Sequence, residues 1–205
     1  MAGPPVVLCR PDGLHVAESP RLWIVTGRAS DHARWQRLVA GDPVAGGDWP
    51  VRLRHALSES PFDAVADPLD ADQPLLPDDP NHLFFAGIDQ HTSLLVAGVV
   101  ATTTTGVTEV GGVVQRDCRG RGFGHEMLGE VCRLLHGHFG VARLVAGCEE
   151  ANLASRAWLA GAGFTPAAGA PAYRLANGRP ARPMWWERID AKAVHRCRRP
   201  GPSSR

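Results

Sequence analysis

The sequence predicts a mixed α/β domain, with a mostly antiparallel sheet flanked by helices. Three observations lead to this prediction. Short runs rich in β-branched and aromatic residues recur along the chain and end at glycine-rich turns, as strands do. Three of these runs follow one another between residues 82 and 115 with only short breaks, which favours an antiparallel meander. Two later segments carry apolar residues at helical spacing.

The first half of the chain contains one strand candidate and one helix candidate. Residues 1–20 are rich in proline and glycine, and we expect them to form an N-terminal extension. The run 21–27 is typical of a strand that ends at its glycine. Ser30 is a suitable N-cap for a helix over 31–40, in which three apolar residues share one face; they are Trp35, Leu38 and Val39.

Residues 45–80 show no regular pattern beyond a possible short helix over 49–60, because prolines interrupt the rest. Six aspartates crowd this region: Asp63, Asp67, Asp70, Asp72, Asp78 and Asp79. A solvent-exposed loop is the ordinary interpretation of such a charge run. The alternative is a rim that attracts a cationic ligand to a cleft.

The second half of the chain is more regular. Its elements are predicted in this order: strands at 82–88, 93–103 and 107–115, a helix at 125–139, a strand at 141–148, a helix at 152–164 and a closing hairpin over 173–189 with its turn near Asn177-Gly178. The core face of the first helix is predicted to comprise Met127, Leu128, Val131, Leu134 and Leu135. Residues 190–205 have the composition of a loose basic tail.

Composition excludes several function classes. The chain of 205 residues has a formal net charge of +1, which gives no overall attraction to nucleic acid or to an acidic membrane. No apolar run is long enough to span a bilayer, and residues 1–20 do not resemble a leader. Five cysteines without a CxxC pair favour a reducing, cytoplasmic setting. His136 and His138 are two apart on a helix, so no metal site is predicted.

The run "RDCRGRGFGHEM" places three glycines and two arginines where a helix must begin. It fits neither G-x-G-x-x-G nor the phosphate loop of nucleotide hydrolases. The first turn of a helix carries N–H groups without partners and a partial positive charge, and glycines let phosphate oxygens approach them. We therefore expect a pyrophosphate here, held by the amides of residues 120–124 with help from Arg119 and Arg121. An ordinary strand-to-helix turn is the alternative.

The motif R-x-x-G-x-G over 119–124, the strand before it, and the later Asn152 and Gly163-Phe164 stand in an order that resembles the GNAT superfamily of acetyl-CoA-dependent N-acetyltransferases. Glu109-x-Gly111 and Asn152-x-x-Ser155 make the chain similar to the branch that acetylates the N-termini of ribosomal proteins, the RimJ/RimL-like enzymes. The resemblance spans residues 21–189, and it implies the GNAT fold, in which the sheet is splayed.

The resemblance also implies where the cosubstrate acetyl-CoA would lie. Its pyrophosphate would contact the loop, and its pantetheine arm would run beside the preceding strand, in a gap opened by the strand at 141–148. The implied cofactor-binding residues are Val113, Val114, Gln115, Arg119, Gly120, Arg121, Gly122, Phe123, Gly124 and Asn152. An N–H near Val114, freed where the sheet splays, would polarise the thioester carbonyl.

Two side chains are predicted to be catalytic. Ser155 is the candidate that protonates or hydrogen-bonds the departing thiolate, and a plain capping role is its alternative. Glu109 is the candidate base, with Glu149 and Glu150 as rivals and simple solvation as the alternative. The position that often carries a general-acid tyrosine in GNAT enzymes is Leu159 here.

The predicted reaction is direct attack of a primary amine on acetyl-CoA in a ternary complex. The amine is either a protein N-terminus or a small molecule, and the protein is a monomer or homodimer. A non-catalytic acyl-CoA-binding regulator and, more remotely, a nucleotide-binding oxidoreductase are the rival functions.

Cys118, beside the arginines, could have a lowered thiol pKa, but the chemistry needs no cysteine. The tryptophans are expected in the core; they are Trp158, Trp185 and Trp186.

Overall fold

The computed structural model describes residues 7–9, 15–27, 35, 81–169, 173–174, 180–181 and 183–193. The elements are, in chain order, β1 (Val7–Cys9), β2 (His15–Glu18), β3 (Leu22–Gly27), β4 (His82–Asp89), β5 (Leu95–Thr104), β6 (Val107–Val114), a 3-10 turn (Arg116–Cys118), α3 (Phe123–Gly137), β7 (Arg143–Glu149), α4 (Leu153–Gly161), β8 (Thr165–Ala167), β9 (Tyr173–Arg174), β10 (Pro180–Ala181) and β11 (Pro183–Ile189).

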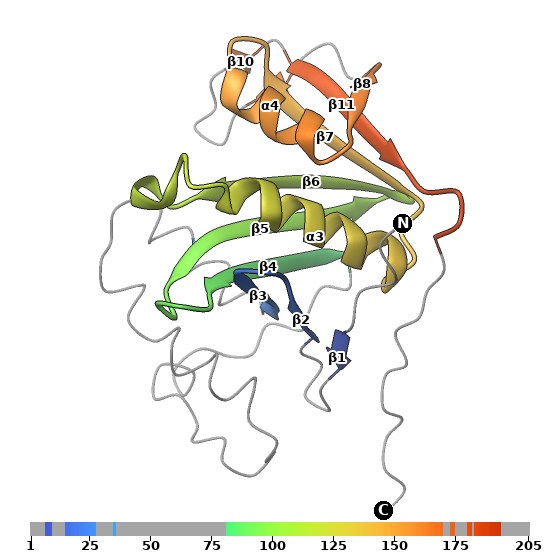
Figure 1. The fold of residues 1–205 in the computed structure, drawn as a ribbon. Coiled ribbons are helices and arrows are strands. Elements are labelled where there is room, and N and C mark those ends of the chain that lie inside the picture. Colours follow the sequence, from blue (N-terminus) through green and yellow to red (C-terminus); the bar gives the residue numbers. More distant parts are fainter. Residues whose placement is uncertain are drawn as a thin grey trace, which may run out of the picture.

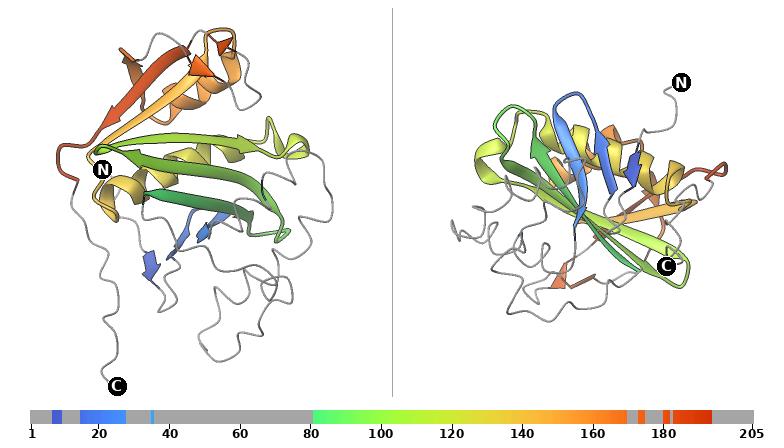
Figure 2. Two further views of the ribbon diagram at one scale, coloured as in Figure 1. Left: turned by 180° about the vertical axis from the view of Figure 1, so that it is seen from behind. Right: turned by 90° about the horizontal axis from the view of Figure 1, so that it is seen from below.

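A nine-stranded sheet in the order β1-β2-β3-β4-β5-β6-β7-β11-β8 organises the molecule (Figure 1). The neighbours are antiparallel except β6 and β7, which run parallel. The predicted α/β fold and the meander of β4, β5 and β6 are therefore confirmed. α3 crosses one face of this meander, and α4 lies over the β7 side of the sheet (Figures 1 and 2).

The N-terminal region contributes more to the sheet than its composition indicated. Within the predicted extension 1–20, β1 and β2 form an antiparallel pair, and β2 continues the sheet by pairing with β3. Both strands are short, with three and four residues. Such short runs carry too little periodicity to be detected, and they form because β3 offers them an edge to pair with. The boundaries of the domain itself, 21–189, stay a prediction.

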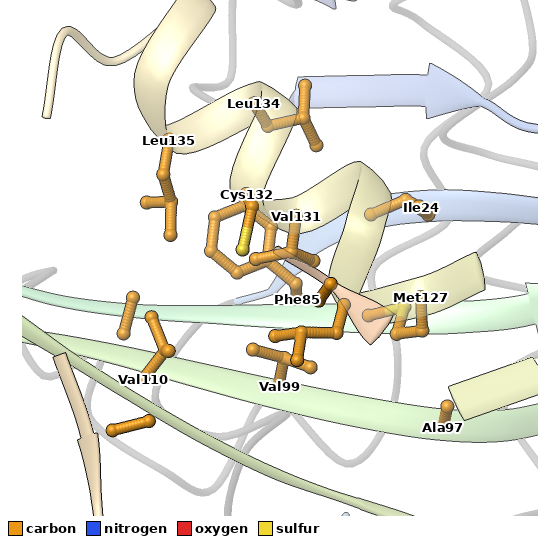
Figure 3. Close-up of a cluster of buried hydrophobic side chains, with 14 of the residues drawn as sticks. Ile24, Phe85, Ala97, Val99, Val110, Met127, Val131, Cys132, Leu134 and Leu135 are labelled. Atoms are coloured by element: carbon orange, nitrogen blue, oxygen red, sulfur yellow. The ribbon is translucent and has the colours of Figure 1, made fainter. Parts of the chain in front are cut away.

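The core lies mainly between the sheet and α3 (Figure 3). All five residues predicted for the core face of α3 are at most 2% exposed. Successive strand residues point to opposite faces, as the two phenylalanines of β4 illustrate. Phe85 packs in the cluster under α3, whereas Phe84 packs on the other face in a smaller cluster that contains Trp35. The period-two alternation therefore assigns each residue of β6 to a face.

Several predictions fall wholly or partly outside the described residues. Trp35 is helical and buried, but the rest of the helix predicted at 31–40 is outside them, as are the aspartate-rich region and the tail beyond residue 193. β9 and β10 pair as the predicted closing hairpin requires, and β11 then joins the main sheet. In the described part of the chain, no helix has both the length and the apolar character that a bilayer span requires.

Candidate active site

The sheet opens between β6 and β7. Their parallel pairing is recorded at Thr108↔Leu144 and Glu109↔Val145 and ends there, while β6 continues to Val114, paired throughout with β5. β7 continues to Glu149, paired with β11. The two strands therefore diverge from Glu109 onward like the arms of a V (Figure 1). This is the splay that the resemblance implied.

Backbone groups of β6 line this opening. The N–H of Gln115 donates to the carbonyl of Val96 on β5 at 2.9 Å. Because backbone groups alternate in direction along a strand, the N–H and C=O groups of Gly112 and Val114 point the other way, to the open side. The carbonyl of Val114 accepts from Nε of Arg119 at 3.0 Å, which agrees with this direction. Gln115 and Val113, by contrast, direct their backbone toward β5.

The glycine loop connects the open end of β6 to α3. Gly120 and Gly122 have φ angles of +73° and +85°, which L side chains rarely adopt. Gly122 is the N-cap of α3 and, as a glycine, offers no side-chain acceptor to the amides of the first turn. The residues predicted to cradle a pyrophosphate therefore include two glycines in the left-handed region and end at the N-terminus of α3.

Hydrogen bonds that the sequence analysis missed connect this loop and the first turns of α3 to the residues just before β3. Arg21, at the start of β3, donates through Nε to Glu126 of α3 at 2.7 Å and through Nη1 to the carbonyl of Arg121 at 2.8 Å. Ser19 donates its hydroxyl to the same carboxylate. The guanidinium groups of Arg21 and Arg121 both lie over the ring of Phe123, 4.7 and 5.2 Å from its centroid. Arg21 therefore adds a second cation beside the loop.

Glu126 anchors this network in its ionised form. Burial alone would raise the pKa of its carboxyl, but hydrogen bonds from Ser19 and Arg21 outweigh burial and lower the pKa below its ordinary value. Arg21 and Glu126 are 105 positions apart, so no local pattern connects them. The only signal in the sequence was a polar Ser-Pro-Arg step directly before an apolar strand.

The start of α4 faces the opening from the β7 side. Asn152 is the N-cap of α4, and its side chain accepts from the N–H of Ser155 at 3.0 Å. Ser155 lies one helical turn before Trp158 and Leu159. Leu159 is buried in the core, and the indole N–H of Trp158 donates to the carbonyl of Gly124 in the first turn of α3. Trp158 thereby ties α4 to the glycine loop.

Glu109 lies at the vertex of the V. It shares the face of Gly111 and Val113, opposite α3, because Val110 packs under α3 and Val113 packs in the cluster of Phe84. Among the described residues, a Cβ added at Gly111 would meet no heavy atom within 4 Å, so these residues leave space on this face at Gly111. Partial burial raises the pKa of the Glu109 carboxyl above its ordinary value.

The other candidates are less suited to proton transfer. Burial raises the pKa of the Cys118 thiol and outweighs the opposing effect of Arg121, so the thiol pKa is not lowered, although its neighbours in the sequence had allowed for that. Glu149 is the last residue of β7, at the open end of the V and far from its vertex, and the exposed Glu150 follows it. Trp186 is buried as predicted, whereas Trp158 and Trp185 are only partly so.

Comparisons with known proteins agree with this geometry. A family model described as an acetyltransferase (GNAT) domain matches residues 21–165. The ribosomal-protein-S5-alanine acetyltransferase of Vibrio fischeri superposes with a TM-score of 0.61 at 18% identity, over 87% of this chain and 98% of that one. A candidate ribosomal-protein-serine acetyltransferase of Vibrio cholerae gives 0.56 at 15% identity, over 85% and 97%.

Spermidine N-acetyltransferase of Vibrio cholerae superposes less well, with a TM-score of 0.50 at 14% identity over 58% of this chain and 71% of that one. No curated protein matches the sequence. At these identities the superpositions establish the fold, and the family model, which spans most of the chain, establishes the family.

Proposed function

Because the chain belongs to the GNAT acetyltransferase family and is therefore an acyltransferase, we propose that it transfers the acetyl group of acetyl-CoA to a primary amine by direct attack in a ternary complex. The observation that supports this proposal best is the end of β6–β7 pairing at Glu109↔Val145. Beyond this pair β7 no longer pairs with β6, so the outward backbone groups of β6 face away from β5 along the stretch that leads to the N-terminus of α3.

Family members use acetyl-CoA as cosubstrate, and the loop provides what its diphosphate needs. The first-turn amides of α3 and the backbone of residues 120–124 would bind the phosphate oxygens, with Arg119, Arg121 and Arg21 contributing positive charge. Pantetheine contains two amide groups, which would pair with outward backbone groups of β6, chiefly the N–H and C=O of Val114. Val113 and Gln115 would contact acetyl-CoA with their side chains. Asn152 would contribute to binding indirectly, because it caps α4 and so fixes where this helix begins.

Distance along β6 selects the amide that polarises the thioester carbonyl. Strand residues rise by about 3.3 Å each, so Val114 is roughly 17 Å from Glu109 and Gly112 roughly 10 Å. A glutamate side chain and one water span the shorter interval but not the longer one. We therefore assign polarisation of the carbonyl to the N–H of Gly112, and binding of the pantetheine arm to Val114.

Proton transfers complete the cycle. Glu109, through water, would take a proton from the amine, and the amine nitrogen would attack the polarised carbonyl to give a tetrahedral intermediate. Collapse of this intermediate breaks the C–S bond and releases the CoA thiolate. The second proton of the attacking nitrogen would pass through water to that sulfur, to which Ser155 of α4 would donate a hydrogen bond. Leu159, at the position of the family's general-acid tyrosine, has no ionisable proton to donate and is buried in the core.

The energetics favour a protein N-terminus as acceptor. Deprotonation of an α-amine with a pKa near 7.8 costs about 1 kcal/mol at pH 7, whereas deprotonation of a lysine near 10.4 costs about 4.6 kcal/mol. One partly buried carboxylate acting through water can offset the cost of deprotonating an α-amine, but not the larger cost of deprotonating a lysine. The superposition on a ribosomal-protein-alanine acetyltransferase is consistent with this preference. We therefore propose peptide α-amines as the substrates, as in the RimJ/RimL-like branch.

Release of free thiol from acetyl-CoA tests the proposal. Purified protein should release CoA with short peptides that begin with alanine or serine. It should do so much more slowly with the same peptides after N-terminal acetylation, even when they contain an internal lysine. Polyamines form a second arm of the screen. A protein that binds acetyl-CoA but turns over no amine in either arm would instead be the non-catalytic regulator, and one that binds neither would contradict both functions.

The Arg21→Ala substitution tests the support of the loop. Loss of its charge-assisted hydrogen bonds should weaken acetyl-CoA binding at least about tenfold, since such bonds contribute about 1.5–3 kcal/mol each when partly shielded from water. Titration calorimetry with CoA measures this effect. Arg133→Ala is the matched control, because it removes an arginine paired to a glutamate, Glu130, on the same helix. Equal affinities of the two variants would contradict the role of Arg21.

A further inference from the structure

Cys9, His15 and His138 bring together three side chains of metal-binding type, well away from the proposed acyl-transfer site. His138 is the C-cap of α3, whereas the glycine loop lies at its N-terminus. At 1.5 Å per residue the two ends of this helix are roughly 24 Å apart. The cluster therefore belongs to a different part of the molecule.

The fold explains why these three residues meet. Cys9 and His15 are directly opposite each other in the β1–β2 ladder, so their side chains leave the sheet on the same face. Ala17, two residues after His15, packs in the core cluster under α3, so this face is the one that α3 covers. The end of α3 then brings His138 over the pair. The sequence analysis considered only His136 and His138 together, and the structure directs them differently: Nδ1 of His136 lies 2.6 Å from the carbonyl of Val141.

The distances match those of a metal centre. Sγ of Cys9 lies 3.6 Å from Nε2 of His138, and this nitrogen lies 3.1 Å from Nδ1 of His15. All three donor atoms lie within 4.8 Å of one another. In a tetrahedral zinc site, bonds of about 2.3 Å to sulfur and 2.0–2.1 Å to nitrogen place neighbouring donors roughly 3.3–3.6 Å apart. Small side-chain adjustments would therefore close the three donors around one ion.

We propose that Cys9, His15 and His138 form a binding site for a transition-metal ion, with Zn²⁺ as the best match to one thiolate and two imidazoles. The surroundings favour a cation. The C-terminus of α3, at His138, carries the partial negative charge that attracts a cation, and the ring of Phe139 packs against both histidines in T-shaped contacts. A water molecule would complete the tetrahedron. Binding displaces the thiol proton to solvent, so the affinity should rise with pH.

The consequence of this site would be structural. β1 and β2 form the outer edge of the sheet, and each is short. A metal ion that links both of them to the end of α3 would hold this edge against the core without contact with acetyl-CoA. We expect Zn²⁺ to raise the unfolding temperature and to leave the kcat of thiol release unchanged.

Metal-free full-length protein provides the test, with Zn²⁺ for stoichiometry and affinity and Co²⁺ as a spectroscopic probe. We expect one ion per chain and, with Co²⁺, the visible bands of a tetrahedral centre together with a thiolate-to-metal charge-transfer band. Since loss of an outer-shell partner alone weakens metal binding about 10–100-fold, loss of a direct ligand in Cys9→Ser or His138→Ala should weaken it at least about 100-fold.

Two control variants sharpen the outcome. His91→Ala removes an exposed histidine in the β4–β5 turn, and Cys197→Ser removes another cysteine; both should bind Co²⁺ like the unmodified protein. Absence of the charge-transfer band from the unmodified protein would overturn the proposal whether or not the variants fold. Loss of that band in Cys197→Ser but not in Cys9→Ser would also overturn it.

Discussion

The Gly122→Val variant should bind acetyl-CoA at least about 100-fold more weakly than the unmodified protein, a loss of about 2.7 kcal/mol. Two physical effects add at this position. The φ angle of +85° is strained for a β-branched residue, at about 1–3 kcal/mol. The new side chain would also start 3.1 Å from Nη2 of Arg21, on a loop where phosphate must approach. Titration calorimetry with CoA measures the loss directly.

A matched glycine separates this local effect from general damage to α3. A Cβ at Gly129, in the middle of the helix, would meet no heavy atom within 4 Å among the described residues. Gly129→Ala should therefore raise the stability by about 1 kcal/mol through helix propensity and leave the affinity for CoA unchanged. If Gly122→Val unfolds cooperatively like the unmodified protein and still binds CoA with its affinity, the proposed position of the diphosphate is wrong.

The elements whose signals lie within a short segment of sequence, such as α3 and the meander of β4, β5 and β6, could be predicted. The three glycines and the apolar spacing of residues 127–135 lie within one short segment, so periodicity and helix-end chemistry alone located α3 and its N-terminal loop. The meander of β4, β5 and β6 followed from short breaks between apolar runs. The signals that located these elements, a helical period, a helix end and short turns, each lie within a few neighbouring residues, which is the condition under which pattern analysis works.

Contacts across long stretches of sequence were not predictable. The carboxylate of Glu126 is held by Ser19 and Arg21, more than 100 positions away. Likewise, Cys9 and His138 are 129 positions apart, so no spacing motif could have connected them. The opening between β6 and β7 came only from the family resemblance, because nothing in the residues of either strand indicates where their pairing ends.

The Cys118 thiol shows a different limit. Neighbours in the sequence, Arg119 and Arg121, favoured a lowered pKa, but the chain folds the thiol into the core, where burial raises it. For Glu109 the same physics has a functional consequence. The alternation along β6 located the face of this residue from sequence, whereas the partial burial that raises its pKa became evident only in the folded protein.

The Glu109→Gln variant should lose about 10²–10⁴-fold in kcat for thiol release, the usual contribution of a general base, with little change in acetyl-CoA binding. Initial rates with an alanine-terminated peptide measure this loss. In the unmodified protein, activity should fall as the pH drops through the Glu109 pKa, which burial raises above its ordinary value. The part of the acidic limb that Glu109 causes should disappear in the variant, which leaves the part caused by protonation of the peptide amine. Unchanged kcat would contradict the role of Glu109 and direct attention to Glu149→Gln and Glu150→Gln.

The Glu109→Gln variant should be more stable than the unmodified protein at pH 7, although its kcat is lower. This combination distinguishes a catalytic loss from a folding defect. Because the folded state raises the pKa of Glu109, this carboxyl favours folding most below its unfolded pKa, near 4.5, and that contribution is lost as the pH rises through the folded value. The glutamine side chain of the variant does not ionise, so the variant does not lose this stability as the pH rises. The variant should therefore unfold at a higher temperature than the unmodified protein at pH 7, and the difference should narrow at acid pH. A variant that is both less active and less stable at pH 7 would indicate that Glu109 supports the structure and does not accept the proton.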